Sequence, residues 1–159
     1  MASVRRVLIV DDERDIRTTL RAVFGSAGYE CRMAGNGGRE AAVLFETERS
    51  PLTITDLNMP IMDGLQLLQH VKARDADAAV IMLTGAADVR IAVESLKQGA
   101  SDFILKPVNL DQVLLSAERA LEHRQLLMER REHQALLEYR VAEATGDLAT
   151  ALGELQQTY

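Results

Sequence analysis

Short apolar runs alternate with amphipathic stretches along the first two thirds of the chain. Runs of this length, rich in branched apolar side chains, predict β-strands. They are VLIV (7–10), YECRMA (29–34), LTIT (52–55), AVIML (79–83) and DFIL (102–105). YECRMA is the most polar of the five, which favours a place at the edge of a sheet.

The segments between these runs carry apolar residues at helical spacing. Their members recur three or four positions apart, as on one face of a helix. They are Ile16, Leu20, Val23, Phe24 and Ala27; Ala41, Leu44 and Phe45; Leu65, Leu68 and Val71; and Val89, Ala92, Val93 and Leu96. Gly28 and Gly99 follow the first and last groups, where glycine commonly ends a helix. Strands alternating with helices predict an α/β fold, with a parallel sheet covered on both faces.

The charge distribution argues against a nucleic-acid-binding surface. The chain has 159 residues and a formal net charge of −6. Residues 1–108 carry 13 basic and 15 acidic side chains, and residues 109–159 carry 5 basic and 9 acidic ones. Neither segment offers the basic surface that binds a phosphate backbone, so we expect no direct nucleic-acid binding.

Cysteine usage and the N-terminus predict a cytoplasmic protein. Cys31 is the single cysteine, so neither an internal disulfide nor a cysteine-based zinc site can form within the chain. The N-terminal stretch MASVRRVLIVDD holds a short apolar run that two acids interrupt at once. This pattern matches neither a signal peptide nor a membrane span, and we expect no membrane association.

Polar residues follow four of the five predicted strands. Asp11 and Asp12 come after the first strand, Asp56 after the third, Thr84 after the fourth and Lys106 after the fifth. The carboxyl ends of parallel strands meet at one edge of a sheet, where ligands bind. Three carboxylates brought together there would repel one another unless a cation were bound. An oxygen-only ligand set without cysteine or a nearby histidine favours Mg²⁺, with Mn²⁺ as the alternative.

Such a site could receive a phosphoryl group. With a metal ion, Lys106 and Thr84 would form a cradle for phosphoryl oxygens. A carboxylate in that cradle can act as a nucleophile and form an aspartyl phosphate, and Asp56 is the predicted acceptor. Taken singly, the acids could open a helix, Thr84 could cap one and Lys106 could lie on the surface; together they favour a site. Asp63 is interpreted as part of an ordinary turn.

Four motifs resemble a known family. LIVDDE, TDLNMPIMDG, LTG and DFILKP occur in the order and spacing of the CheY-like receiver domains of bacterial response regulators, across about residues 4–122. The resemblance implies a flavodoxin-like, doubly wound, five-stranded parallel sheet with strand order 2-1-3-4-5. It implies a signalling phosphoacceptor with limited phosphotransfer and autodephosphorylation activity, not a metabolic enzyme. The expected phosphodonor is a sensor histidine kinase or a phosphotransfer protein.

The resemblance also implies metal ligands. Asp56 matches the phosphorylated aspartate of the family. Asp12 and Asp56 match its metal-ligating carboxylates, and the main-chain carbonyl of Asn58 matches a third protein ligand. Asp11 matches the other acid of the pair, which acts on the metal through water.

The remaining matched positions concern the response to phosphorylation. Thr84 matches the hydroxyl that moves to the phosphoryl group, and Lys106 matches the ion-pair partner of that group. Phe103 matches the switch aromatic residue, here without a hydroxyl. The peptide bond between Lys106 and Pro107 is expected to be cis, as in the family. Thr55 is more polar than the usual residue before the phosphorylated aspartate.

The C-terminal third is predicted to be helical. Asn109 and Gln112 are spaced as a capping box, and helix formers dominate beyond them. We expect residues 1–122 to form the receiver domain and residues 123–159 a helical extension that links it to an effector domain. Extensions of this kind loosely resemble the linker helix before a cyclic-dinucleotide phosphodiesterase domain in some response regulators.

Apolar residues of the extension recur at spacings of four and three. They are Leu137, Val141, Ala144, Leu148, Ala151 and Leu155. This pattern is typical of a coiled-coil seam and predicts a parallel homodimer. The alternative is a solitary amphipathic helix that packs on its own receiver or on a missing domain, and Gly146 and Gly153 weaken the coiled-coil pattern.

Two other classes of protein compete with a receiver. A metal-dependent phosphohydrolase commonly carries its nucleophile in a D-x-D motif after the first strand, whereas this chain has Asp11-Asp12-Glu13 there. A structural dimerisation module derived from a receiver would not need an acceptor site. The presence of Asp56, Thr84 and Lys106 argues against that second class.

Overall fold

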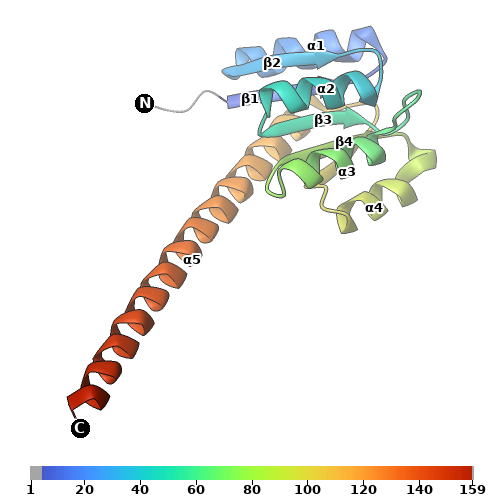
Figure 1. Cartoon of the computed structure of the whole chain (residues 1–159). Helices are drawn as coiled ribbons and strands as arrows, with labels where there is room; N and C mark the ends of the chain where they lie inside the picture. The colour runs from blue at the N-terminus through green and yellow to red at the C-terminus, as the bar shows by residue number, and fades with distance from the viewer. Residues whose placement is uncertain (1–4, 159) are drawn as a thin grey trace. The chain divides into compact units, whose positions relative to one another are not determined.

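The computed structural model describes residues 5–158, so residues 1–4 and 159, the outer ends of the two predicted domains, lie outside the described residues. Strands and helices alternate as the sequence predicts (Figure 1). The elements are β1 (Arg5–Val10), α1 (Arg14–Ser26), β2 (Tyr29–Ala34), α2 (Gly38–Glu48), β3 (Leu52–Asp56), α3 (Gly64–Arg74), β4 (Ala79–Thr84), the short 3₁₀ turn η1 (Ala86–Asp88), α4 (Val89–Lys97), β5 (Asp102–Leu105) and α5 (Leu110–Thr158).

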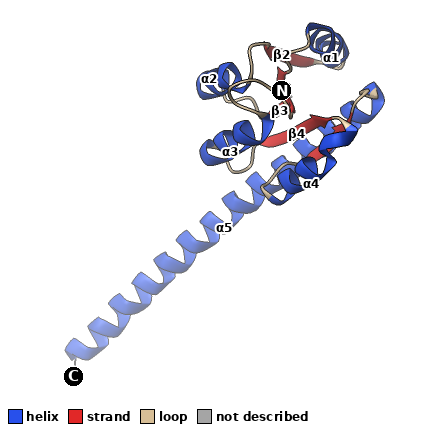
Figure 2. Cartoon of the chain, turned by 90° about the vertical axis from the view of Figure 1, so that its right-hand side faces the viewer, coloured by secondary structure: helices blue, strands red, loops and turns tan. Residues whose placement is uncertain are grey.

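The strands form one parallel sheet in the order β2-β1-β3-β4-β5, which confirms the predicted doubly wound fold. The polar strand β2 lies at one edge, as expected, and β5 lies at the other. Figure 2 shows α2 and α3 together on one side of the strands, with α1 on the other side. Because every strand is parallel, all carboxyl ends lie along the same edge of the sheet.

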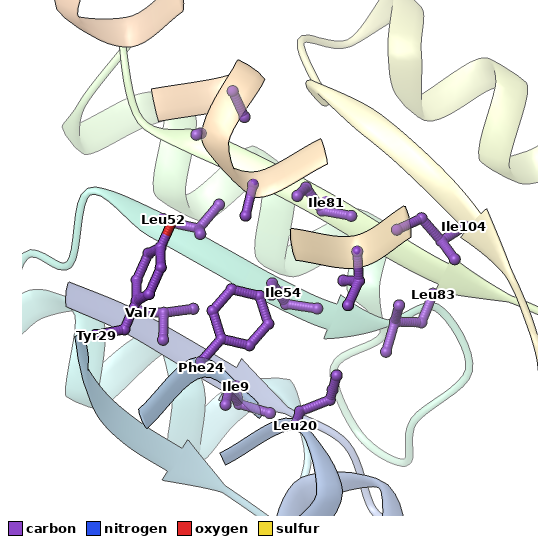
Figure 3. Packing of buried hydrophobic residues seen from close by; sticks show 14 residues of the cluster. Val7, Ile9, Leu20, Phe24, Tyr29, Leu52, Ile54, Ile81, Leu83 and Ile104 are labelled. Atoms are coloured by element: carbon purple, nitrogen blue, oxygen red, sulfur yellow. The ribbon is translucent and has the colours of Figure 1, made fainter. Parts of the chain in front are cut away.

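One hydrophobic core fills the face of the sheet that α1 and the first turns of α5 cover (Figure 3). Leu20 and Phe24 of α1 are buried there, as the helical spacing predicts. The rings of Phe24 and Tyr29 meet edge to face, with their centroids 5.0 Å apart. Val113 and Ala117 of α5 are fully buried in the same cluster, so the start of α5 belongs to this core.

A second core lies on the opposite face, under α2 and α3. Phe45 from α2 and Leu68 from α3 pack there against Val80 and Met82 of β4. Phe103 of β5 is partly buried against the same cluster. Since both faces of the sheet are covered, its central strands β3 and β4 are buried along their whole length.

Helix α4 forms where its apolar spacing predicts, but it buries a different face. Ala92 and Ser95 are its buried residues. Val93 is 43% exposed and Leu96 is 38% exposed, although both belong to the predicted apolar group. Ser95 can be buried because its hydroxyl donates a hydrogen bond to the Ala92 carbonyl within the helix, which satisfies the polar group.

Side-chain caps start two of the helices. The Asp63 carboxylate accepts a hydrogen bond from the Gln66 amide at 2.8 Å, and the Gln66 side chain accepts one from the Asp63 amide at 3.0 Å. This is a complete capping box, so Asp63 has a structural role in its loop, and the acid-x-x-Gln spacing is the signal for the more specific role of a helix cap. Asn109 caps α5 by accepting a hydrogen bond from the Gln112 amide at 3.1 Å.

The chain divides into two compact units, Met1–Arg124 and Gln125–Tyr159. Helix α5 is 49 residues long and continues through Gly146 and Gly153. The larger apolar residues of the predicted seam are exposed in the single chain, Leu137 by 45% and Leu148 by 62%. Among residues 5–158, no helix combines the length and the apolar composition that crossing a membrane requires.

We predict that Gly64→Ala destabilises the protein by about 1–3 kcal/mol because the added methyl group has no space. A Cβ at Gly64 would lie 2.4 Å from the main-chain oxygen of Asp56 and 3.0 Å from the Leu57 Cα. Urea unfolding measures the change. Gly25→Ala is the matched control, since nothing lies within 4 Å of a Cβ at that exposed position of α1. The control should be stabilised by about 0.5–1 kcal/mol, and equal effects of the two substitutions would contradict the prediction.

Candidate functional site

The main chain places four polar side chains at the carboxyl edge of the sheet. Asp56 ends β3 and Thr84 ends β4. Asp11 follows β1 and is held by a hydrogen bond of 3.2 Å from its amide to the Ala34 carbonyl. Lys106 follows β5, and its amide donates to the Thr84 carbonyl at 2.8 Å. These two bonds extend the sheet's pairing by one residue, so both side chains start from a rigid edge.

Lys106 lies between the carboxylates of two different strands. Its Nζ is 3.1 Å from Asp11 Oδ2 and 3.3 Å from Asp56 Oδ2. Glu13 Oε1 lies farther away, at 3.9 Å. The expectation that residues far apart in the chain meet at this edge therefore holds for Asp11, Asp56 and Lys106.

Burial makes the charges of this cluster costly. Asp11 is 0% exposed and Asp56 is 7% exposed. Burial, reinforced by the negative charge of Asp11, raises the pKa of Asp56 to about 6 against the opposing effect of Lys106. Burial also raises the pKa of Asp11, although the Glu13 amide and Lys106 oppose the shift. Burial alone would lower the pKa of Lys106, but the charges of Asp11 and Asp56 outweigh it and raise that pKa.

Three carboxylates are close enough to share one metal ion. Asp11, Asp12 and Asp56 each offer an oxygen atom, and these three atoms lie within 4.8 Å of one another. Asp11 and Asp56 are buried, whereas Asp12 is exposed. Because the donors are carboxylate oxygens alone, the set fits a hard divalent cation such as Mg²⁺.

The other predicted site residues lie around this cluster. Thr84 is buried, and its hydroxyl donates to the Gly85 carbonyl at 3.2 Å. The side-chain amide of Asn58, in the loop after β3, donates to Asp88 Oδ2 at 2.6 Å. This bond ties the loop that follows Asp56 to the start of α4. Phe103 packs in the second core, and the metal-ligand role of the Asn58 carbonyl stays a prediction.

The peptide bond before Pro107 and the hydrogen bond of Thr55 account for two details of the sequence. The peptide bond between Lys106 and Pro107 is cis, as predicted. Thr55 is fully buried, and its hydroxyl donates to the Asp56 carbonyl at 2.9 Å. A polar residue can therefore precede Asp56 in a buried strand without leaving its hydroxyl unpaired.

Sequence reasoning missed one residue beside the acids. Arg17 of α1 donates a hydrogen bond from Nη1 to the main-chain oxygen of Asp11 at 2.6 Å. An arginine on the polar side of an amphipathic helix carries no local signal for such a contact. Only the path of the chain from β1 into α1 brings the guanidinium back over the first acid.

Comparisons with known proteins agree over most of the chain. A family model described as the response regulator receiver domain matches residues 7–118. Regulatory protein AtoC of Escherichia coli (strain K12) is 39% identical over 137 residues, covering 86% of this chain and 30% of AtoC. The C4-dicarboxylate transport transcriptional regulatory protein DctD of Rhizobium meliloti (strain 1021) is 34% identical, covering 97% of this chain and 32% of DctD. The chain thus spans about a third of the length of these two relatives.

Shorter relatives and solved structures match the same region. Chemotaxis protein CheY of Listeria monocytogenes serovar 1/2a is 34% identical over 115 residues, covering 72% of this chain and 97% of CheY. The crystal structure of NtrX from Brucella abortus aligns with a TM-score of 0.76 at 32% identity, covering 82% of this chain and 29% of NtrX. A response regulator receiver domain protein from Clostridium thermocellum aligns with a TM-score of 0.75 at 28% identity, covering 78% of this chain and 99% of its own.

We predict that Asp56→Asn stabilises the metal-free protein at about pH 8 and by roughly half as much at about pH 5. The folded-state pKa of Asp56, about 6, lies above its ordinary value of 3.8, so the folded state holds the proton more tightly. That contribution to stability is fully present below the ordinary pKa and is lost as the pH rises through about 6. The wild-type protein should therefore lose up to about 3 kcal/mol relative to the variant over the whole range from below pH 3.8 to above pH 6, and roughly half of that between pH 5 and pH 8.

Urea unfolding in the presence of a chelator, at both pH values, measures this difference. Asp15→Asn, which removes one exposed carboxylate of α1, is the control. It should shift stability little, and by similar amounts at the two pH values. A stability difference between wild type and Asp56→Asn that does not change with pH would contradict the prediction.

Proposed function

The chain belongs to the family of response regulator receiver domains, and on that premise we propose that Asp56 accepts a phosphoryl group and that α5 carries the resulting signal. The proposed donor is a sensor histidine kinase or a phosphotransfer protein, and the proposed setting is the cytoplasm. One observation carries the proposal: Asp56 is a buried carboxylate at a strand end, with Lys106 at 3.3 Å and two further acids beside it. A purely structural site would not need two buried carboxylates with a third acid beside them.

The acids fit a catalytic Mg²⁺, with Mn²⁺ as the alternative. Asp11, Asp12 and Asp56, together with the Asn58 carbonyl, would hold it, with Asp11 acting through water. When bound, such an ion neutralises the carboxylates and draws charge from phosphoryl oxygens. Lys106 offsets part of the negative charge on its own, because it contacts both Asp11 and Asp56.

Asp56 supplies the nucleophile. At neutral pH its pKa of about 6 leaves the carboxylate mostly ionised. One carboxylate oxygen forms a bond to phosphorus while the donor's bond to phosphorus breaks, and the departing imidazole keeps the electron pair of that bond. The negative charge on Asp56 thus moves out onto phosphoryl oxygens, where Lys106 can follow it as an ion-pair partner. This is phosphotransfer with limited autodephosphorylation, not turnover of a metabolite.

The response would begin at Thr84. Its hydroxyl now bonds only a main-chain carbonyl, that of Gly85, so it can exchange this bond for a charge-assisted one to the phosphoryl group. The new bond exists in one state only, which is the condition for a population shift. Phe103 is partly buried next to β4 and would turn inward as Thr84 leaves its place.

The helical extension is the proposed output element. We assign residues 1–122 to the receiver and residues 123–159 to a linker helix that precedes an effector domain. The relatives AtoC and DctD are about three times as long as the segment they share with this chain, which supports a further domain. DctD is, by its name, a transcriptional regulatory protein, which favours that class of output over a phosphodiesterase. The absence of direct nucleic-acid binding is proposed only for the residues of this chain.

Self-association would give the extension a partner. At 1.5 Å per residue, a helix of 49 residues is about 73 Å long. Burying the seam against a second copy would stabilise the dimer by roughly 1.5 kcal/mol or more per large side chain. Parallel pairing places both receivers at one end of the coiled coil, as a signal relay along α5 requires.

We predict that acetyl phosphate with Mg²⁺ adds one phosphoryl group to the protein and that Asp56→Asn abolishes the addition. Intact-protein mass spectrometry and Phos-tag electrophoresis both measure it. Asp63→Asn is the matched control because it alters an acid of the same loop that caps α3 and lies outside the acid cluster. The control should be labelled like the wild type. Labelling of Asp56→Asn at the wild-type level would disprove the assignment of the acceptor.

A second prediction concerns the oligomeric state. Sedimentation velocity at tens of micromolar protein should show a dimer for the full chain and a monomer for residues 1–122. Leu148→Glu should favour the monomer because it places a charge in the seam. Tyr139→Glu should leave the dimer intact, since Tyr139 is exposed but lies off the seam. A monomeric full chain would mean that the extension pairs with its own receiver or with another domain.

A further inference from the structure

Arg17 and Gly35 fit together beside the first acid of the site. A Cβ at Gly35 would lie 2.6 Å from Cζ, 2.7 Å from Nη1 and 2.9 Å from Nη2 of Arg17. All three nearest atoms therefore belong to one guanidinium group. Unlike Gly28, Gly37 and Gly99, Gly35 does not have a positive φ. Its backbone conformation thus suits other residues, and a Cβ at position 35 would instead displace the flexible end of Arg17.

The same guanidinium holds the peptide group that joins two acids of the site. Nη1 of Arg17 donates to the Asp11 carbonyl at 2.6 Å, and that carbonyl belongs to the peptide bond between Asp11 and Asp12. The other polar groups of Asp11 are also engaged. Its amide bonds the Ala34 carbonyl, Oδ1 accepts from the Glu13 amide at 2.9 Å, and Oδ2 contacts Lys106.

Asp12 depends on that peptide for its direction. It is the exposed member of the acid cluster, whereas Asp11 and Asp56 are buried on the edge of the sheet. An exposed side chain at the start of a loop is oriented mainly by its own backbone. The Asp11 carbonyl and the Asp12 amide lie in one rigid plane, so a bond that fixes the carbonyl also fixes the direction in which Asp12 leaves the chain.

We propose that Arg17, whose guanidinium lies where a Cβ at position 35 would be, is a positioning residue that orients Asp12 toward the metal. The inference rests on the proposed Mg²⁺ site but concerns residues that the proposed reaction does not use. Arg17 acts through the main chain of Asp11, so its effect is geometric. Charge alone would act in the opposite direction, because a cation beside the site repels Mg²⁺.

Mg²⁺ titration separates these two effects. Arg17→Lys keeps the positive charge but loses the planar fork, and Gly35→Ala keeps the arginine but displaces its guanidinium. Each variant should bind Mg²⁺ about tenfold more weakly than the wild type, as loss of a group that orients a metal ligand typically does. Arg14→Ala is the control: it removes an exposed cation of the same helix and should leave affinity unchanged or slightly tighter. Tighter or unchanged binding by Arg17→Lys and Gly35→Ala would overturn the proposal.

A double-mutant cycle tests the pairing of the two residues. Once Arg17→Ala has removed the guanidinium, Gly35→Ala should cause no further loss of Mg²⁺ affinity. Additive losses would show that Gly35 acts independently of Arg17 and would overturn the proposal that the two residues act together. Circular dichroism and urea midpoints establish that each variant is folded. Arg17→Lys changes one partner of the Arg17–Gly35 contact and Gly35→Ala changes the other.

A readout without metal keeps the inference separate from the proposed function. In the metal-free protein, the amide nitrogen resonance of Asp12 should shift in Arg17→Lys and in Gly35→Ala, because the hydrogen bond to its own peptide carbonyl is altered. It should stay in place in Arg14→Ala. If the wild-type protein binds no Mg²⁺ but the Asp12 resonance still shifts in the two variants, the proposed metal site is refuted and the positioning role stands. An Asp12 resonance that is unmoved in both variants would refute the positioning role itself.

Discussion

Two buried carboxylates share one lysine at the carboxyl edge of the sheet, and the remaining architecture makes this arrangement tolerable. Lys106 contacts Asp11 and Asp56, which come from two different strands, while Asp12 adds a third acid nearby. One cation cannot neutralise three carboxylates, so the cluster keeps an excess of negative charge. Burial first, and then the negative charge of Asp11, raises the pKa of Asp56. Two hydrophobic cores, one on each face of the sheet, hold the strand ends in place against the repulsion.

Close main-chain packing braces the loops that carry the acids. A Cβ at Gly64 would meet the Asp56 carbonyl at 2.4 Å, and one at Gly38 would meet the Met62 carbonyl at 2.5 Å. The starts of α2 and α3 therefore lie directly against the end of β3 and the loop that follows it. Arg17 braces the loop after β1 in the same sense, through the Asp11 carbonyl. The geometry of the acids thus depends on close contacts between backbones and on one side chain, Arg17, that bonds a backbone carbonyl.

Helix α5 begins in the buried core of the receiver and continues as an exposed helix. Its first turns are part of the receiver, since Val113 and Ala117 are fully buried and the Ser116 hydroxyl donates to Asp102 at 2.7 Å. Beyond Arg124, which pairs with Asp75 at 3.4 Å, its side chains are almost all exposed in the single chain. A helix that begins in a core and continues as an amphipathic rod is suited to report changes in that core. The proposed relay to an effector domain depends on this change of environment along α5.

The sequence by itself determined the elements, their order and the members of the acid cluster. Short apolar runs and helical spacing are local patterns, and in a parallel sheet a residue that follows a strand must lie at the common edge. Only the tertiary structure decided which face α4 buries, how Thr55 satisfies its hydroxyl, how strongly the pKa of Asp56 rises and that Arg17 lies over Gly35. Each of these depends on distances between groups on different elements, whose packing no local pattern encodes. Charge and hydrogen bonding act through space, so residues 95 positions apart, such as Asp11 and Lys106, become partners only once the chain has folded.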